Sequence, residues 1–118
     1  MTEIMIVDNS QPTRHALQAL LSQQSGIQVI AEASNGMDAI KLIQNRIPDL
    51  ILMDVRMPVM DGLEATRNIK RDWPQIKVVI LTMYPDCQAE AEIAGADAFI
   101  IKGCALDEML STISSQME

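Results

Sequence analysis

The chain has 118 residues and a net charge of −7, and 48% of its residues are apolar, as expected of one globular domain. Because lysine and arginine are not clustered, this acidic segment is unsuited to direct nucleic-acid binding. No apolar stretch approaches the ~20 residues of a membrane span, and the acidic start does not resemble a signal peptide, so we expect a cytoplasmic protein.

The first apolar run, residues 4–7, predicts a buried strand that stops at Asp8. A loop then leads into a helix with Pro12 in its first turn, and Gly26 marks the end of this segment. Its apolar positions repeat with helical spacing and are Ala16, Leu17, Leu20 and Leu21. Residues 27–31 predict a second, weaker strand.

The middle of the chain continues this alternation of strand and helix. Asn35-Gly36 turns the chain into a second helix. We expect this helix to bury its apolar positions, Ala39, Ile40, Leu42 and Ile43. Pro48-Asp49 ends the helix, and the apolar run 50–53 predicts a strand that stops at Asp54.

A third helix is predicted from Gly62 to about Arg71, and Trp73-Pro74 stops it. Its expected buried positions are Leu63, Ala65, Thr66 and Ile69. The apolar run 78–81 predicts a further strand, which stops at Thr82.

The last part of the chain predicts a short helix over residues 87–94, and Gly95 terminates it. A strand follows at 99–101 and stops at Lys102. A final helix is predicted from about residue 106 to residue 117.

The predicted order is therefore five strands alternating with five helices. Right-handed crossovers between such units give a parallel sheet with helices on both faces. We expect an α/β, flavodoxin-like, doubly wound (βα)5 three-layer sandwich with strand order 2-1-3-4-5. In such a fold Asp8, Asp54, Thr82 and Lys102 all lie at one edge of the sheet, beyond the carboxyl ends of the strands.

Two neighbouring carboxylates repel each other, and Mg²⁺ with oxygen ligands relieves that repulsion. Lys102 can pair with a phosphoryl oxygen, and the hydroxyl of Thr82 can donate a hydrogen bond to another. The four residues therefore predict a site where a phosphoryl group is transferred to a carboxylate, with Asp54 as the acceptor.

The segment 48–62, PDLILMDVRMPVMDG, resembles the receiver domain of two-component response regulators. Asp8 after the first strand, Leu81-Thr82 and Ile101-Lys102 fit the same family in order and spacing, and the resemblance spans essentially the whole chain. The motif at 54–62 together with the downstream threonine and lysine is highly specific for this family.

The resemblance implies that Asp54 accepts a phosphoryl group from a phosphohistidine on a sensor kinase or phosphotransfer protein. It further implies Mg²⁺ held by Asp54, Asp8, the residue after Asp8 and the backbone carbonyl of Arg56. Thr82 and Lys102 would bind the phosphate, and Phe99 would turn inward as Thr82 moves. Such a domain is a signalling acceptor that catalyses only its own phosphotransfer and dephosphorylation.

Two positions depart from the family pattern. Asn9 stands where the family usually has a second acidic residue, so we expect weaker Mg²⁺ binding than in an Asn9→Asp variant. Gly103 stands where many members have a proline, often on a cis bond, so we expect an unusual backbone conformation without that lock.

The short helix at 87–94 and the sequence around Gly95 resemble receivers of the NarL/LuxR type, which carry a C-terminal helix-turn-helix output domain. We therefore expect residues 1–118 to be the receiver domain of a longer transcription regulator, although a stand-alone receiver is the alternative. Receivers of this kind often form homodimers, through either the fourth helix, fifth strand and fifth helix or the first and fifth helices.

Other interpretations remain open at this point. A pseudo-receiver that lost Mg²⁺ binding through Asn9 would act as a phosphorylation-independent interaction module, and the fold also allows an FMN binder of the flavodoxin type. Asn9 is also a candidate helix cap, and the Arg56 side chain either flanks the phosphate or is merely solvated. Asp61-Gly62 is expected to be a turn and helix start, and His15 a surface histidine.

Overall fold

The computed structural model describes residues 1–118, and five parallel strands form one sheet in the order β2-β1-β3-β4-β5. The strands are β1 (Thr2–Val7), β2 (Ile27–Ala33), β3 (Leu50–Met53), β4 (Lys77–Thr82) and β5 (Ala98–Ile101). The helices are α1 (Gln11–Ser22), α2 (Gly36–Asn45), α3 (Gly62–Asp72), the 3-10 turn η1 (Pro85–Cys87), α4 (Gln88–Ala94) and α5 (Leu106–Gln116). The predicted fold and strand order are confirmed.

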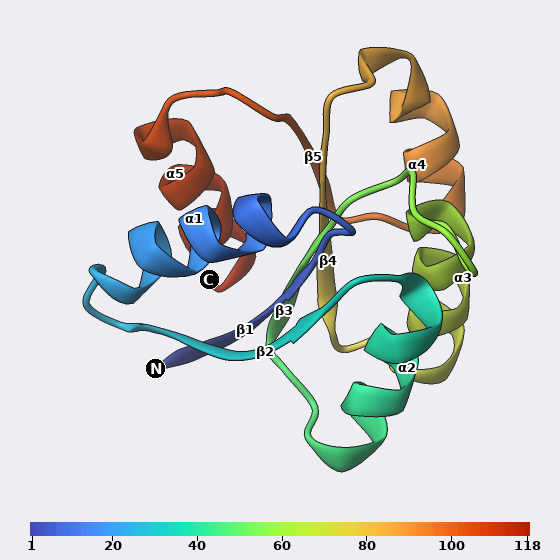
Figure 1. Cartoon of the computed structure of the whole chain (residues 1–118), viewed down its shortest axis with the longest axis horizontal. Helices are drawn as coiled ribbons and strands as arrows, with labels where there is room; N and C mark the ends of the chain where they lie inside the picture. Colours follow the sequence, from blue (N-terminus) through green and yellow to red (C-terminus); the bar gives the residue numbers. More distant parts are fainter.

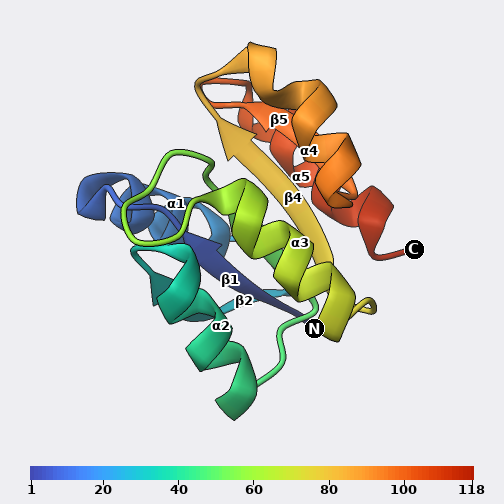
Figure 2. The same cartoon turned by 90° about the vertical axis from the view of Figure 1, so that its right-hand side faces the viewer.

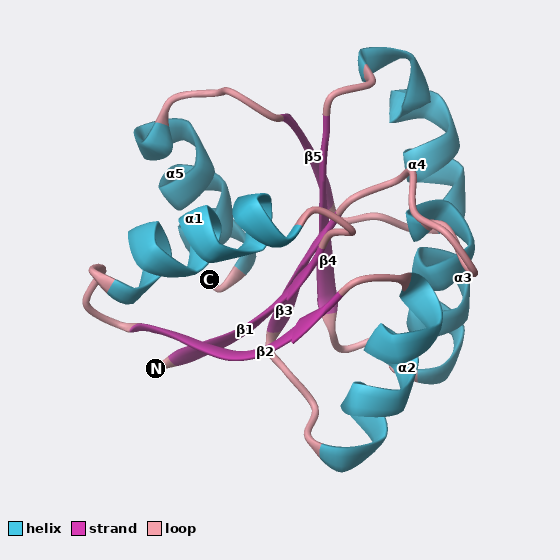
Figure 3. Ribbon diagram, viewed as in Figure 1, coloured by secondary structure: helices cyan, strands magenta, loops and turns pink.

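The sheet is the middle layer of three (Figures 1 and 3). Helices α1 and α5 cover one face, and α2, α3 and α4 cover the other. Successive strand residues point to opposite faces, so Ile4 and Ile6 pack toward α1 and α5 whereas Met5 and Val7 pack on the other side. Burial of both faces explains why the strand sequences are unbroken apolar runs.

Two of the predicted helices bury a narrower stripe than expected. In α1 only Leu17 and Leu21 are buried, whereas Leu20 remains 41% exposed. In α2 the buried apolar residues are Ala39 and Ile43 alone. Ile40 and Leu42 are half-buried because a helix turns about 100° per residue, which places them at the margins of that stripe.

Several boundaries differ from the prediction: β1 begins at Thr2, β4 spans Lys77–Thr82 and β5 begins at Ala98, and two further differences have a visible cause. Strand β2 continues to Ala33, because the Asp8 backbone N–H donates to the Ala33 carbonyl at 3.0 Å and extends the pairing with β1. Helix α4 begins at Gln88, because residues 85–87 form the 3-10 turn η1. Gly95 ends α4 with a φ of +100°, as predicted for a glycine terminator.

Helix α3 lies between α2 and α4, as Figure 2 shows. All four of its predicted core positions are buried. Its last turn is closed by Trp73, whose backbone N–H donates to the Ile69 carbonyl at 2.7 Å. The Trp73 side chain is half-buried and packs against the core beneath α2, α3 and α4.

The start of α3 packs directly on the backbone of Asp54. A Cβ atom at position 62 would lie only 1.8 Å from the Asp54 carbonyl oxygen, so this position requires glycine. The Gly62 N–H also donates to the Val55 carbonyl at 2.7 Å, which folds the β3–α3 loop back onto the strand end. None of the helices has the length and hydropathy that a membrane-spanning helix needs.

Candidate phosphoacceptor site

Three charged side chains from three strand ends meet at the carboxyl edge of the sheet. Lys102 Nζ lies 2.6 Å from Asp8 Oδ2 and 3.2 Å from Asp54 Oδ2. Asp8 is 2% exposed and Asp54 is 6% exposed. The parallel strands therefore bring together the two carboxylates and the ammonium group as the sequence predicts.

Backbone groups hold both carboxylates in place. Asp54 Oδ1 accepts a hydrogen bond from the Val55 N–H at 2.8 Å, and the Asp54 N–H donates to the Val7 carbonyl at 2.9 Å. Asp8 Oδ1 accepts from the Ser10 N–H at 2.8 Å. Because each carboxylate has one oxygen fixed by the backbone, its other oxygen faces Lys102.

The pKa values of Asp54 and Lys102 are both raised, but for different reasons. Burial, followed by the charge of Asp8, raises the pKa of Asp54, and Lys102 only partly offsets this effect. Burial by itself would lower the pKa of Lys102, but hydrogen bonds and charges from Asp8 and Asp54 together raise it. Lys102 is therefore held charged beside an acid whose ionisation is unfavourable.

Thr82 and Phe99 lie on β4 and β5, the two strands on the Lys102 side of the sheet. Thr82 is fully buried at the end of β4, where its Oγ1 accepts a hydrogen bond from the Tyr84 N–H at 3.3 Å. Its carbonyl accepts from the Lys102 N–H at 2.8 Å, which joins the ends of β4 and β5. Phe99 pairs with Ile80 across β4 and β5 and is half-buried against the core beneath α2, α3 and α4.

The loop after β1 corrects one interpretation of Asn9. Helix α1 is capped by Ser10, whose side chain accepts from the Thr13 N–H at 3.3 Å, and Asn9 is exposed. Asn9 is not the helix cap, because Asp8 Oδ1 binds the Ser10 N–H and places Ser10 at the capping position.

Arg56 is exposed but is not simply solvated. Its guanidinium carbon lies 3.8 Å from the centre of the Tyr84 ring, a cation–π contact that joins the β3–α3 and β4–α4 loops. Gly103 has a φ of +91° and the chain contains no cis peptide bond, which agrees with the expected glycine-dependent conformation after Lys102.

Two further predictions are confirmed. Asp61 caps α3, since its Oδ1 accepts from the Glu64 N–H at 2.8 Å. His15 is exposed on α1. Neither residue contacts the cluster of Asp8, Asp54 and Lys102 through a hydrogen bond or ion pair.

The oxygen donors suit a hard cation. The structure contains no group of three or more His, Cys, Asp or Glu side chains that could hold a metal ion. Mg²⁺ retains several waters and needs few protein ligands. The carboxylates of Asp8 and Asp54, which share contact with one ammonium group, fit that requirement.

Two contacts near the site were not foreseen from the sequence. Arg14 on α1 pairs with Glu32 on β2, and Arg56 stacks on Tyr84. The partners are far apart along the chain, and nothing in their local sequence indicates the pairing. Only the three-dimensional fold brings them together.

Comparison with known proteins agrees with the fold and identifies the family. Residues 4–114 match the family model described as the response regulator receiver domain. Because this match covers most of the chain, the protein belongs to the receiver-domain family of two-component response regulators. The resemblance drawn from the 48–62 motif is thereby confirmed.

Among named relatives, the response regulator GacA of Pseudomonas aeruginosa is 37% identical over 115 residues, which are 96% of this chain and 54% of GacA. The response regulator UvrY of Escherichia coli K12 is 37% identical over 117 residues, covering 98% of this chain and 54% of UvrY. The chain thus spans about half the length of the curated relatives it matches.

Solved structures show the same fold over nearly the whole of this chain. A DNA-binding response regulator of the LuxR family from Staphylococcus aureus superposes with a TM-score of 0.93 at 29% identity, covering 100% of both chains. CheY in a complex with CheX, BeF3 and Mg²⁺ from Borrelia burgdorferi gives a TM-score of 0.90 at 25% identity, covering 99% of this chain and 90% of that chain.

Proposed function

We propose that this chain is a phosphorylation-controlled signalling switch in which Asp54 accepts a phosphoryl group. The donor is a phosphohistidine on a sensor histidine kinase or phosphotransfer protein. The observation that carries the proposal is the buried contact of Lys102 with both Asp8 and Asp54 in a chain of the receiver family.

In the transfer, a carboxylate oxygen of Asp54 attacks phosphorus. A P–O bond forms while the P–N bond to the donor histidine breaks, and the bonding electrons leave with the imidazole nitrogen. Lys102 already lies beside the attacking carboxylate of Asp54, and in the transfer its ammonium group would pair with a phosphoryl oxygen instead. Asp54 is the nucleophile, and Lys102 neutralises charge.

Asp8, Asp54, the amide oxygen of Asn9 and the backbone carbonyl of Arg56 would hold Mg²⁺. The ion supplies charge neutralisation for the phosphoryl group when it is bound. Support comes from the oxygen donors of the site and from the structural similarity to CheY in a Mg²⁺-containing complex. Because Asn9 brings no negative charge, it is the weak member of this set.

Thr82 and Phe99 would transmit the change. The Thr82 hydroxyl accepts a hydrogen bond from Tyr84 but retains its own proton, which it can donate to a phosphoryl oxygen. Movement of Thr82 toward Asp54 would vacate space beside β4, and Phe99, half-buried on β5, would turn inward to fill it. The negative charge of the phosphoryl group on Asp54 would thus shift Thr82 and Phe99 from one of two arrangements to the other.

We further propose that residues 1–118 form the receiver domain of a longer, cytoplasmic transcription regulator. Support comes from relatives about twice as long and from similarity to a LuxR-family DNA-binding regulator. A C-terminal DNA-binding domain would give the output, and homodimer formation is part of this proposal.

The experiment is phosphorylation by a small phosphodonor. With acetyl phosphate and Mg²⁺, we expect a mobility shift on a phosphate-binding gel for the wild type and for Asp72→Asn, which changes an exposed carboxylate at the end of α3. Asp54→Asn should abolish the shift because it removes the nucleophile. A wild-type protein that stays unmodified under forcing conditions would instead support a phosphorylation-independent interaction module.

A further inference from the structure

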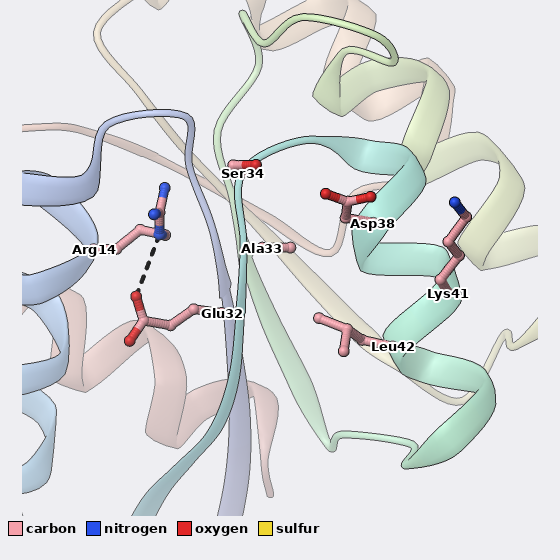
Figure 4. Close-up of a pocket in the computed structure, with 7 residues that line it drawn as sticks. All are labelled: Arg14, Glu32, Ala33, Ser34, Asp38, Lys41 and Leu42. Carbon is pink, nitrogen blue, oxygen red and sulfur yellow. Dashed lines mark hydrogen bonds and ion pairs between the residues drawn. The ribbon is translucent and has the colours of Figure 1, made fainter.

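An ion pair lies beside the loop that carries Asp8 and Asn9. Arg14 Nε on α1 is 3.3 Å from Glu32 Oε1 on β2, and the two side chains are only 15% and 26% exposed. Figure 4 shows them facing each other on the α1 side of β2, along a cavity of about 420 Å³. The α2 residues that line the other side of this cavity make no hydrogen bond or ion pair with them.

Arg14 also contacts the loop directly. Its Nη1 donates a hydrogen bond to the backbone carbonyl of Asp8. Asp8 is then held at four atoms, because its N–H also donates to the Ala33 carbonyl, its Oδ1 accepts from the Ser10 N–H and its Oδ2 contacts Lys102. The Arg14 guanidinium therefore fixes the stretch of backbone from which the side chains of Asp8 and Asn9 both extend.

A guanidinium in this position has an electrostatic consequence. The carboxylates of Asp8 and Asp54 are opposed by two cations, Lys102 and Arg14, so these four groups carry no net charge. Glu32 neutralises Arg14 and restores one negative charge around the site. A divalent cation is attracted to the site more strongly when that negative charge is present.

We propose that Arg14 and Glu32 are positioning residues of the Mg²⁺ loop. Arg14 fixes the backbone of Asp8, and Glu32 supplies, through Arg14, the negative charge that Asn9 does not. This inference rests on the Mg²⁺ site of the proposed function and adds two residues outside the ligand set. The negative charge that Asn9 does not provide is thus supplied by Glu32 on the neighbouring strand β2.

The test is a Mg²⁺ titration followed by the amide NMR shifts of residues 8–10, without any phosphodonor. We expect Glu32→Gln to weaken Mg²⁺ affinity about tenfold. Mutation of residues that support metal ligands without binding the metal typically lowers affinity by about 10- to 100-fold, and this is the lower end of that range. The matched control is Glu3→Gln, which removes the Arg46–Glu3 ion pair between α2 and β1 and should leave Mg²⁺ affinity unchanged.

A second variant separates the effect of charge on Mg²⁺ affinity from the effect of the hydrogen bond between Arg14 and the Asp8 carbonyl. The double variant Arg14→Gln/Glu32→Gln removes one cation and one anion, so it should bind Mg²⁺ more tightly than Glu32→Gln alone. It should not regain full affinity, because the hydrogen bond to the Asp8 carbonyl is lost. Added salt should narrow the gap between Glu32→Gln and the double variant.

The outcomes are distinguishable. If Glu32→Gln and the double variant lower only thermal stability while Mg²⁺ affinity stays at the wild-type value, the pair merely joins α1 to β2 and the inference is wrong. If the wild type shows no Mg²⁺-dependent shift at residues 8–10, the metal site of the proposed function fails, and this inference fails with it.

Discussion

The surroundings of Asp54 disfavour the ionised form of its carboxyl group. Burial and the neighbouring Asp8 raise its pKa above the ordinary value of 3.8. The folded protein therefore binds this proton more tightly than the unfolded chain does. Stability contributed by the protonated form is lost as pH rises from 3.8 through the raised pKa, so ionised Asp54 opposes folding at neutral pH.

We therefore predict that Asp54→Asn, measured without Mg²⁺, has a higher melting temperature than the wild type near pH 7. The advantage should shrink toward about pH 3, where both states hold the proton. Thermal unfolding followed by circular dichroism measures both effects. Asp72→Asn is the control, because Arg71 lowers the pKa of Asp72 and its removal should not stabilise the protein. Equal melting temperatures at neutral pH would contradict the argument.

At the scale of elements, the β3–α3 connection fixes the position of the Asp54 backbone. The start of α3 presses against the Asp54 carbonyl, and the loop between them folds back through the Gly62 to Val55 hydrogen bond. Neither backbone segment can move without disturbing the packing, since β3 is buried and α3 packs on the core. Any side chain at position 62 must therefore displace the strand end that carries Asp54.

We predict that Gly62→Ala lowers the free energy of unfolding by about 3 kcal/mol or more, because the clash is with backbone. Gly26→Ala is the control: its φ is +85° but no atom lies within 4 Å of the added Cβ. It should cost only about 1–2 kcal/mol, the strain of a left-handed alanine. Urea unfolding compares the two, and equal losses would show that close approach is unimportant.

The elements that the sequence predicts well are those buried on both faces or bounded by glycine and proline. The strand ending at Asp54 and the stop at Gly95 follow directly from local pattern. The sequence predicts less where neighbours decide: β2 gains two residues from pairing with β1, and α2 leaves Ile40 half-buried at the edge of its packed stripe. Periodicity specifies a face but not how much of it is covered.

The same limit applies to the site. The convergence of Asp8, Asp54 and Lys102 could be predicted because parallel strands end at one edge of the sheet. The contact between Arg14 and Glu32 could not, because it depends on how α1 is oriented relative to the edge strand β2. The roles of the site residues in phosphoryl transfer stay predictions until they are measured.

Across the whole molecule, charge is distributed unevenly. Residues 83–118 contain seven acidic side chains and one basic side chain, a net charge of −6, which leaves −1 for residues 1–82. The single cation, Lys102, is already paired with Asp8 and Asp54. Most of the acids are exposed: Asp86, Glu90, Glu92, Asp107, Glu108 and Glu118.

A homodimer formed through α4, β5 and α5 would bring these carboxylates toward one another. We predict that the chain is monomeric at low ionic strength and that any self-association strengthens with added salt, because salt screens the repulsion. Sedimentation velocity at low and high salt measures this. Glu90→Gln/Glu92→Gln should associate at lower salt than the wild type. A dimer that dissociates on adding salt would show that attraction between opposite charges dominates instead.

The position of Trp73 determines what fluorescence can report about this protein. Trp73 is the only tryptophan, and it closes the end of α3 opposite to the end that touches Asp54. Eleven helical residues separate the two ends by about 16 Å. Its half-buried indole will respond to loss of the core and therefore gives a clean optical probe of unfolding. A change of charge at Asp54 should alter its emission far less than loss of the core does, so tryptophan fluorescence can follow the unfolding of site variants such as Asp54→Asn.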